Sequence, residues 1–356
     1  MAQYWVQSII LLAVACIVTM LCVPFSSWLA AKTGAIDHPS ARRVNTAPIP
    51  RLGGVAMFLG MVAALLVLAL GIFAFGWETP FGYHELLNDV SYFWLGVSVL
   101  IIFLVGLFDD IRSLNPKVKF AGQVLAACVA AGAGLLLVGI QVPGHVYVNF
   151  GLWAYPITVV YLVAFANIIN LIDGLDGLAS GIALIATLGM AGSLIFVGKP
   201  DQTLFHFAFA GALVGFLRYN YNPASVFLGD SGSMLIGFLV ATLPLATQAP
   251  NSFLVSVGVP MLAMGVPIFD TALAIVRRSL RRIILRRDKS QAGGGDVMTA
   301  DSDHLHHRIL RAAKLNQRRA AWVLYLTASF FVVVGLCGML FESKAAGLWL
   351  FAVAAA

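Results

Sequence analysis

Charged residues are scarce in this sequence. Only 11% of its 356 residues are Asp, Glu, Lys or Arg, whereas 60% are hydrophobic. A soluble domain carries about a quarter charged residues. The shortage therefore excludes an ordinary soluble globular domain and predicts a protein that crosses a membrane several times. Cysteine is scarce too, and the four cysteines lie in apolar runs without the spacing of metal ligands, so we interpret them as packing residues.

Two further features are missing. The first apolar segment has no leading basic region and no evident cleavage site, so we expect it to be retained as a span. No internal repeat is visible, which counts against a transporter built from inverted repeats.

Long apolar runs recur along the chain, each close to the length of about 20 residues that crosses a bilayer. We predict an all-α integral membrane protein with about 10–11 transmembrane helices, in a single polytopic membrane domain over 1–356. The candidate spans are 5–30, 52–75, 90–108, 120–140, 151–169, 178–197, 203–219, 233–249, 253–276 and 320–341, with a shorter run at 346–356.

Basic residues gather in alternate loops. Of the 22 Lys and Arg residues, 20 fall on one side of the predicted membrane, and the opposite loops keep only Lys199 and Lys344. The positive-inside rule places the basic loops in the cytoplasm and the N-terminus outside. The net charge of +6 then follows from topology and from attraction for membrane lipids and anionic substrates, so no nucleic acid is expected as a partner. On the outer side, 141–151 alternates β-branched and polar residues and predicts a short β-hairpin.

Polar residues gather on the predicted cytoplasmic face. Asp109 and Asp110 end the third span, and three further polar segments, 167–181, 218–233 and 301–314, lie in later loops of the same side. Acids, amides and histidines on one face predict a single site assembled from several loops. Two acids at a helix C-terminus oppose the helix dipole, which favours a cationic partner such as a metal, with a solvated helix end as the alternative.

The two middle segments carry acids and amides at short spacing. Asn167, Asn170, Asp173 and Asp176 recur every three residues, which on a helix would drift around one face; the alternative is a glycine-rich turn. Asp230 lies in a Gly-flanked turn that opens the next span, a position that suits both an N-cap and phosphate binding. Nearby, Phe227 could stack on a base or anchor the loop.

The last long loop, 277–319, is basic and carries an amphipathic helix at 277–289. Farther on, His304, His307 and Arg308 share one helix face, which predicts a phosphate-binding surface, while His306 points elsewhere. The alternative is an interfacial helix against anionic lipids. A zinc site is less favoured, because no cysteine accompanies the histidines.

Five motifs, in this order, resemble the polyprenyl-phosphate N-acetylhexosamine-1-phosphate transferases over about residues 30–315. They are GLFDDI with NPKVKFAGQ, NIINLIDGLDGLASG, VFLGDSGSMLIG, PIFDT and HLHHRIL. The His-x-His-His pattern at 304–307 and IPRLGG at 49–54 are similar to the bacterial undecaprenyl-phosphate GlcNAc-1-phosphate transferase branch. One departure is Ser113, which stands where members often carry the third acid of Asp-Asp-x-x-Asp.

The resemblance implies transfer of N-acetylhexosamine 1-phosphate, GlcNAc 1-phosphate in this branch, from a UDP-sugar to undecaprenyl phosphate. UMP leaves, and the product starts cell-envelope glycan synthesis in the bacterial inner membrane. Mg²⁺ is the implied cofactor, with Mn²⁺ as the other option, and a homodimer stays open. The alternatives are a phospho-MurNAc-pentapeptide translocase, another UDP-N-acetylhexosamine donor, a CDP-alcohol phosphotransferase and an ion-coupled transporter.

The same resemblance assigns roles to residues. The metal site is expected at Asp230 and Asn170. The catalytic residues are expected to be Asp109, Asp110, Asp173, Asp176, His304 and His307. The substrate-binding residues are expected to be Lys117, Lys119, Asn220, Phe227, His306 and Arg308. Because Asp109 and Asp110 end an apolar run, we expect them to serve the lipid acceptor, apart from the donor and metal residues.

Overall fold

Nine long helices dominate the part of the chain that the computed structural model describes, residues 2–39, 47–77, 90–142, 146–246, 265 and 316–340. The helices are α1 (Ala2–Thr33), α2 (Gly53–Phe75), α3 (Tyr92–Arg112), α4 (Pro116–Gly132), α5 (Ala154–Ile172), α6 (Leu178–Phe196), α7 (Leu204–Asn220), α8 (Gly229–Ala246) and α12 (Gln317–Leu340). Short pieces join them: strands β1 (Ile36–Asp37), β2 (Ile49–Pro50), β3 (Gly139–Val142) and β4 (Val146–Asn149), and 3₁₀ turns η1 (Gly151–Trp153) and η2 (Pro200–Thr203).

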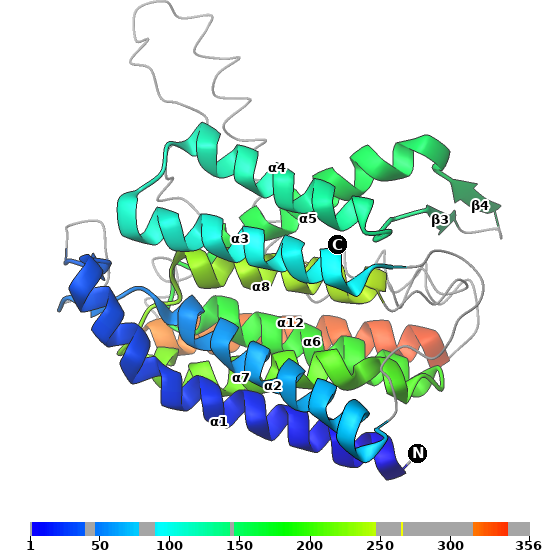
Figure 1. Cartoon of the computed structure of the whole chain (residues 1–356), viewed down its shortest axis with the longest axis horizontal. Coiled ribbons are helices and arrows are strands. Elements are labelled where there is room, and N and C mark those ends of the chain that lie inside the picture. The colour runs from blue at the N-terminus through cyan, green and yellow to red at the C-terminus, as the bar shows by residue number, and fades with distance from the viewer. Residues whose placement is uncertain are drawn as a thin grey trace, which may run out of the picture.

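The helices form a bundle in which the chain runs back and forth (Figure 1). Helix α1 packs against α2 and α7, and α8 packs against α3 and α5. The N-terminus and the β3–β4 hairpin lie at one end of the bundle, at the right of Figure 1. The C-terminal ends of α1, α3 and α5 and the starts of α2, α4 and α8 lie at the opposite end. The described parts of the loops that the sequence predicts to be basic and polar therefore meet at one end.

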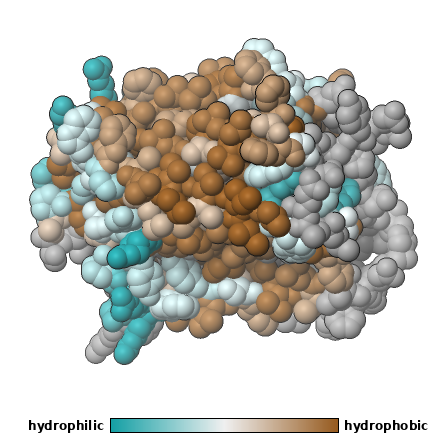
Figure 2. Space-filling model, turned by 60° about the horizontal axis from the view of Figure 1, so that its bottom comes forward, coloured by the Kyte–Doolittle hydropathy of each residue, from teal (hydrophilic) through white to brown (hydrophobic). Residues whose placement is uncertain are grey.

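The lengths of the helices and the apolar side chains on their surface are those of a membrane protein. Seven of the described helices are long and apolar enough to cross a bilayer, which confirms the predicted all-α integral membrane class. Helices α4 and α7 have 17 residues each and are shorter. Large apolar side chains point outward, including Phe73 at 93% and Phe93 at 73% exposure. Figure 2 shows a broad hydrophobic surface on the face in view, as expected for a surface that contacts lipid.

The predicted β-hairpin is confirmed, two residues earlier than predicted: β3 and β4 pair antiparallel with Gly139 opposite Asn149. The predicted span 120–140 is wrong in its second half, because α4 ends at Gly132. The chain then passes through Gly134 at φ +92°, a left-handed conformation that ends a helix, and enters β3. The predicted spans 253–276 and 346–356 and the amphipathic helix 277–289 lie outside the described residues.

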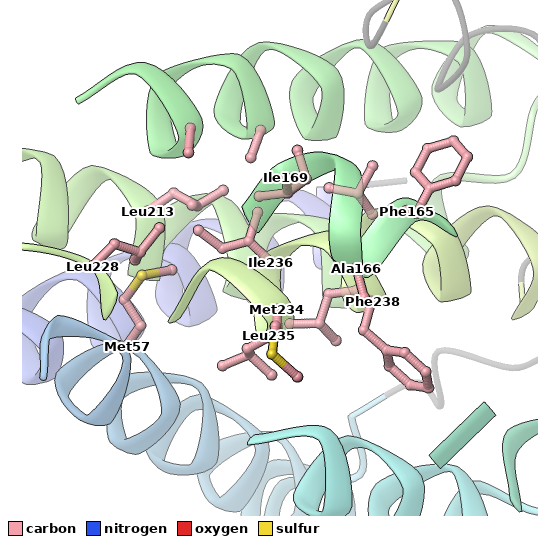
Figure 3. Close-up of a cluster of buried hydrophobic side chains, with 14 of the residues drawn as sticks. Met57, Phe165, Ala166, Ile169, Leu213, Leu228, Met234, Leu235, Ile236 and Phe238 are labelled. Carbon is pink, nitrogen blue, oxygen red and sulfur yellow. The ribbon is translucent and has the colours of Figure 1, made fainter. Parts of the chain in front are cut away.

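Helix α8 forms the centre of the core. Every residue from Ser231 to Leu245 is buried, as expected for a helix that is surrounded by other helices. Figure 3 shows Met234, Ile236 and Phe238 of α8 close to residues of α5. The backbones of α5 and α8 approach closely, because a Cβ added at Gly237 would lie 2.4 Å from the Phe165 carbonyl oxygen. The N-terminus of α8 is thereby placed among the other helix ends.

Candidate active site

Asp110 holds the N-terminus of α8. Its Oδ1 accepts the N–H of Asp230 at 2.8 Å, and its Oδ2 accepts the N–H of Ser231 at 2.9 Å. The Asp110 side chain is completely buried, and Arg51 Nε lies 3.4 Å from Oδ1. A helix N-terminus has free N–H groups and a positive dipole end, so it stabilises a buried carboxylate. The cationic partner expected for this acid is a helix end together with an arginine.

Close backbone packing makes this junction of α2, α3 and α8 possible. Gly229 opens α8 at φ +71°, a conformation that favours glycine. A Cβ added at Gly106 of α3 would lie 2.5 Å from the Asp230 carbonyl oxygen, and one at Gly54 of α2 would lie 2.2 Å from the Gly232 nitrogen. Bulkier residues at these positions would push α8 away, so the glycines fix where Asp230 stands.

Lys119 joins two carboxylates. Its Nζ lies 2.9 Å from Asp109 Oδ2 and 3.0 Å from Asp230 Oδ2. Asp109 is fixed from behind, because its Oδ1 accepts the N–H of Leu114 at 2.6 Å. Ser113, which stands in the place of the third acid, closes α3 in the left-handed conformation at φ +48° and directs no acid toward this cluster.

The contact through Lys119 corrects one expectation. Asp109 does not lie apart from the predicted metal residue, because a single ammonium group contacts both Asp109 and Asp230, while the expected role of Asp109 toward the lipid acceptor stays a prediction. Asp110 is also joined to Asp230, through the backbone N–H that it accepts. The two acids of α3 and the acid of α8 therefore form one cluster, which we call the α3–α8 junction: Asp109, Asp110, Lys119 and Asp230 with Arg51.

Asn170 completes the surroundings of Asp230. Its Nδ2 donates to Asp230 Oδ1 and, at 2.8 Å, to Ser233 Oγ. Asn167, one turn earlier, instead exchanges hydrogen bonds with Gln123 of α4, with Nδ2 donating to Gln123 Oε1 at 2.7 Å. The predicted single helix face is therefore wrong: α5 ends at Ile172, and the next two acids lie in the following loop.

Asp176 and Asn220 tie that loop to the loop before α8. Asp176 Oδ2 accepts the side-chain amide of Asn222 at 2.8 Å and the N–H of Ala224 at 3.0 Å. Asn220 is buried, and its Oδ1 accepts the N–H of Gly177 at 3.1 Å. Both residues were predicted from the sequence to serve the substrates, and in this structure each is engaged in holding the loops together.

Asp173 differs from the other acids. It follows directly after α5, is half-buried, and has no hydrogen-bond or ion-pair partner among the residues that the structure describes. Loss of surrounding water raises the pKa of the Asp173 carboxyl well above its usual value, and neighbouring carboxylates raise it further. These neighbours are Asp230, Asp110 and Asp176. Asp173 is therefore a carboxyl group without compensating charge, facing the α3–α8 junction.

Helix α12 contacts both this loop and the loop before α8, which the sequence did not indicate. Tyr325 Oη donates to the Gly177 carbonyl oxygen at 2.6 Å, and Trp322 Nε1 donates to Tyr221 Oη at 2.8 Å. The Gln317 side-chain oxygen accepts from the Asn222 amide at 3.3 Å. No motif covers these positions, so only the three-dimensional structure brings them to the site.

The remaining predicted residues are placed as follows. Phe227 is half-buried, and its backbone is bonded on both sides: its N–H donates to the Pro50 carbonyl oxygen at 2.8 Å, and its carbonyl accepts the N–H of Gly53 at 3.0 Å. Lys117 is exposed at the start of α4, near but not within the contacts of the junction. Outside the described residues lie His304, His306, His307 and Arg308.

The chain is similar in sequence to known proteins. Residues 92–248, which include Asp109, Lys119 and Asp230, match the family described as Glycosyl transferase family 4. The chain is 34% identical over 349 residues to a probable undecaprenyl-phosphate N-acetylglucosaminyl 1-phosphate transferase of Bacillus subtilis, covering 97% of this chain and 88% of that protein. The chain belongs to the polyprenyl-phosphate N-acetylhexosamine-1-phosphate transferase family.

Two further members of the family indicate its range. A decaprenyl-phosphate N-acetylglucosaminephosphotransferase of Mycobacterium tuberculosis is 32% identical, over 84% of this chain and 74% of its own length. A phospho-N-acetylmuramoyl-pentapeptide-transferase of Moorella thermoacetica is also 32% identical, over 72% of this chain and 77% of its own length. The sequence similarity thus extends to transferases that are named for different sugars.

The donor groups of this transferase suit a divalent cation. Two carboxylates, from Asp109 and Asp230, converge on one positively charged atom, and the amide of Asn170 lies against Asp230. Within the described part of the chain, no three Asp, Glu, His or Cys side chains gather closely enough to hold a metal by themselves. Mg²⁺ is commonly bound by one or two carboxylates together with substrate phosphates, so the available groups fit an ion that arrives with its substrate.

Proposed function

We propose that this transferase moves GlcNAc 1-phosphate from UDP-GlcNAc to undecaprenyl phosphate and releases UMP. The single observation that carries the proposal is the α3–α8 junction, where Lys119 bridges Asp109 and Asp230 at the end of the bundle that collects the polar loops. Acids and cations at the membrane edge suit a reaction between a lipid phosphate and a soluble nucleotide. The names of relatives that use GlcNAc support the choice of sugar.

The reaction is a displacement at phosphorus. An oxygen of the lipid phosphate attacks the β-phosphorus of the donor, the bond from that phosphorus to the bridging oxygen breaks, and UMP leaves with the electron pair. The lipid phosphate is already largely ionised near neutral pH, with a second pKa of about 6, so no covalent enzyme intermediate is required. The work of the protein is to position two anions and to offset their charge.

We assign the metal to Asp230 and Asn170, with Asp109 beside them. When bound there, Mg²⁺ or Mn²⁺ would offset the negative charge that develops on the donor phosphates. Lys119 keeps the two carboxylates close together before the substrates arrive, and it can then turn toward a phosphate oxygen. We assign Asp173 to the donor side, because it has no partner of its own among the described residues and lies within the electrostatic reach of Asp230 and Asp110.

The same reasoning sets the topology. We place the junction on the cytoplasmic side of a bacterial inner membrane and the N-terminus outside. Of the 22 Lys and Arg residues, 20 fall in the alternate loops that the sequence predicts to be cytoplasmic, and Arg51, Arg112 and Lys119 of these loops lie at the junction end. The hairpin end of the bundle then faces outward. UDP-sugars are cytosolic, so this orientation brings the donor to the side where the acids are.

A transfer assay with purified protein tests the proposal. Radiolabelled UDP-GlcNAc, UDP-GalNAc and UDP-MurNAc-pentapeptide are each supplied with undecaprenyl phosphate and Mg²⁺. We expect label to enter the lipid phase from UDP-GlcNAc, with one UMP released per lipid product. Label from the pentapeptide donor alone would instead assign the chain to the phospho-MurNAc branch. Ion flux in proteoliposomes without any lipid product would replace the enzyme with a transporter.

A further inference from the structure

Arg51 lies at the junction but belongs to none of the sequence motifs that carry acids or histidines. It follows β2 and precedes α2, and its N–H donates to the Ala35 carbonyl oxygen at 3.0 Å. Its own carbonyl oxygen is in close contact with Gly229, where an added Cβ would lie at 2.1 Å. The backbone of Arg51 is therefore held on two sides, and its side chain starts from a fixed point next to the first residue of α8.

The guanidinium group of Arg51 is only partly used. Its Nε lies 3.4 Å from Asp110 Oδ1, the oxygen that also accepts the N–H of Asp230. This Nε is buried and forms no hydrogen bond, whereas the side chain as a whole is 26% exposed. A guanidinium carries five N–H donors, four of them on the two terminal nitrogens. Among the residues that the structure describes, these terminal nitrogens have no partner.

The buried acid does not need the whole of this cation. Asp110 already accepts two backbone N–H groups from α8, one on each oxygen. The other cation of the junction, Lys119, is occupied by two carboxylates. Arg51 thus offers a positive charge and four N–H donors that no described residue accepts, close to the first residues of α8, where the helix N-terminus also favours an anion.

We propose that Arg51 is a substrate-binding residue, whose terminal guanidinium nitrogens bind phosphate oxygens of one of the two substrates while Nε stays against Asp110. The inference rests on the proposed function, because that function supplies the phosphates. A guanidinium matches two phosphate oxygens at once, which a lysine cannot do. The phosphate belongs either to the nucleotide donor or to the lipid acceptor, and the two sources are separable by experiment.

The test compares Arg51→Gln and Arg51→Lys with the wild type and with Arg112→Gln. Arg112 is an exposed arginine at the end of α3, so its substitution removes one positive charge from the same end of the bundle without touching the junction contacts. Steady-state rates give the KM for UDP-GlcNAc and for undecaprenyl phosphate separately. Binding of each substrate is measured in parallel by calorimetry, and thermal unfolding in detergent reports stability.

We expect Arg51→Gln to raise the KM and Kd of one substrate roughly ten- to a hundredfold, the range for a lost charge-assisted hydrogen bond, with little change for the other. Arg51→Lys should recover part of the loss, and Arg112→Gln should change neither constant. An increase for UDP-GlcNAc assigns the donor, and an increase for undecaprenyl phosphate assigns the acceptor. Unchanged affinity for both substrates, with or without a lower melting temperature, would overturn the inference. A wild type that binds both substrates but transfers no sugar would refute the proposed function alone.

Discussion

The α3–α8 junction carries three acids and the loop between α5 and α6 carries two, and the surroundings of these acids differ. At the junction, Asp109 meets Lys119, and Asp110 meets a helix N-terminus and Arg51. In the loop, Asp176 meets only neutral amides, and Asp173 has no partner among the described residues. The acids of the junction contact cationic groups of the protein itself, whereas the carboxyl group of Asp173 in the loop has no compensating charge among the described residues.

This difference has a physical meaning. A buried carboxylate is stable only when cations or N–H groups replace the water it has lost. At the junction, these groups are already in place before any substrate binds, so the charges are preorganised for reaction. In the loop, hydrogen bonds from amides to Asp176 fix the backbone. Loss of surrounding water and the charges of neighbouring carboxylates raise the pKa of Asp173. Substitutions at the two regions should therefore have different consequences, and they are taken in order of expected size.

Removing the negative charge of Asp230 should have the largest effect. Asp230→Asn keeps the shape of the side chain but cannot balance Lys119 or hold a divalent ion. We expect turnover to fall by about a thousandfold or more, in the range found for the loss of a key electrostatic group. Chelation of divalent ions in the wild type should have a similar effect, reversed by Mg²⁺. The measurement is initial rate of lipid product at several Mg²⁺ concentrations.

The matched control is Asp201→Asn, which removes an acid from η2 at the hairpin end of the bundle. Its rate should equal that of the wild type. Turnover of Asp230→Asn within tenfold of the wild type at modest Mg²⁺ would show that the junction is not the reaction centre.

The neighbouring acids of α3 should separate function from stability. Asp110→Asn places an amide where two N–H groups of α8 now donate, so one buried donor loses its acceptor, at a cost of about 1–3 kcal/mol. We expect a melting temperature lower by a few degrees together with a strong loss of rate. Asp109→Asn removes one partner of Lys119 at a position that is 11% exposed, and should lower the rate by about a hundredfold with a smaller loss of stability.

Thermal unfolding and initial rates on the same two preparations check this prediction. Equal decreases of melting temperature in the two variants would mean that Asp109 contributes as much to stability as Asp110. Both acids would then serve mainly to hold the helices together.

Much of this could be predicted from the sequence, for identifiable reasons. Apolar runs and the distribution of Lys and Arg are periodic or cumulative signals, so the spans and their common polar end were accessible. The position of Asp230 could be predicted because the glycine before it indicates a tight turn, and Gly229 has a positive φ in the structure. The contacts of Arg51 with Asp110 and of Tyr325 with Gly177 join residues 59 and 148 positions apart, and no local pattern encodes them. The prediction that Asn167 and Asp173 share one helix face is wrong because α5 ends between them, at Ile172.

The two acids of the α5–α6 loop should respond in opposite directions. The pKa of Asp173 is raised in the folded protein, so the native state binds more protons than the unfolded chain, and stability falls as pH rises from about 4 through the raised pKa. Asp173→Asn removes this penalty. Its melting temperature should exceed that of the wild type at pH 8, and the difference should shrink toward pH 4.

Asp176→Ala is the companion variant. It deletes the acceptor of Asn222 and of the Ala224 N–H, and should destabilise the protein by about 1 kcal/mol or more. Melting curves from pH 4 to pH 8 for both variants check the contrast. A destabilised Asp173→Asn at pH 8 would indicate that this carboxylate has a cationic partner and that the loop is balanced like the junction.

The smallest effect should come from the brace between α12 and the loop. Tyr325→Phe deletes the hydroxyl that donates to the Gly177 carbonyl oxygen, and it leaves the ring beside Gly181, where an added Cβ would lie 2.3 Å from Tyr325 Cζ. A neutral hydrogen bond contributes about 1 kcal/mol, so the loop loosens without unfolding. Because that loop carries Asp173 and not the junction, we expect the KM for UDP-GlcNAc to rise about two- to fivefold while kcat changes little.

Thr327→Val is the control for this variant, since it also removes one hydroxyl from α12, but that hydroxyl donates to Val323 within the helix and is exposed. Steady-state kinetics with each substrate varied in turn distinguish the outcomes. A fall in kcat for Tyr325→Phe with the KM for UDP-GlcNAc unchanged would mean that the hydrogen bond from Tyr325 to Gly177 affects the reaction at the junction and not donor binding. The two regions would then act as a single unit, since a hydrogen bond to the α5–α6 loop would be setting the rate of phosphoryl transfer.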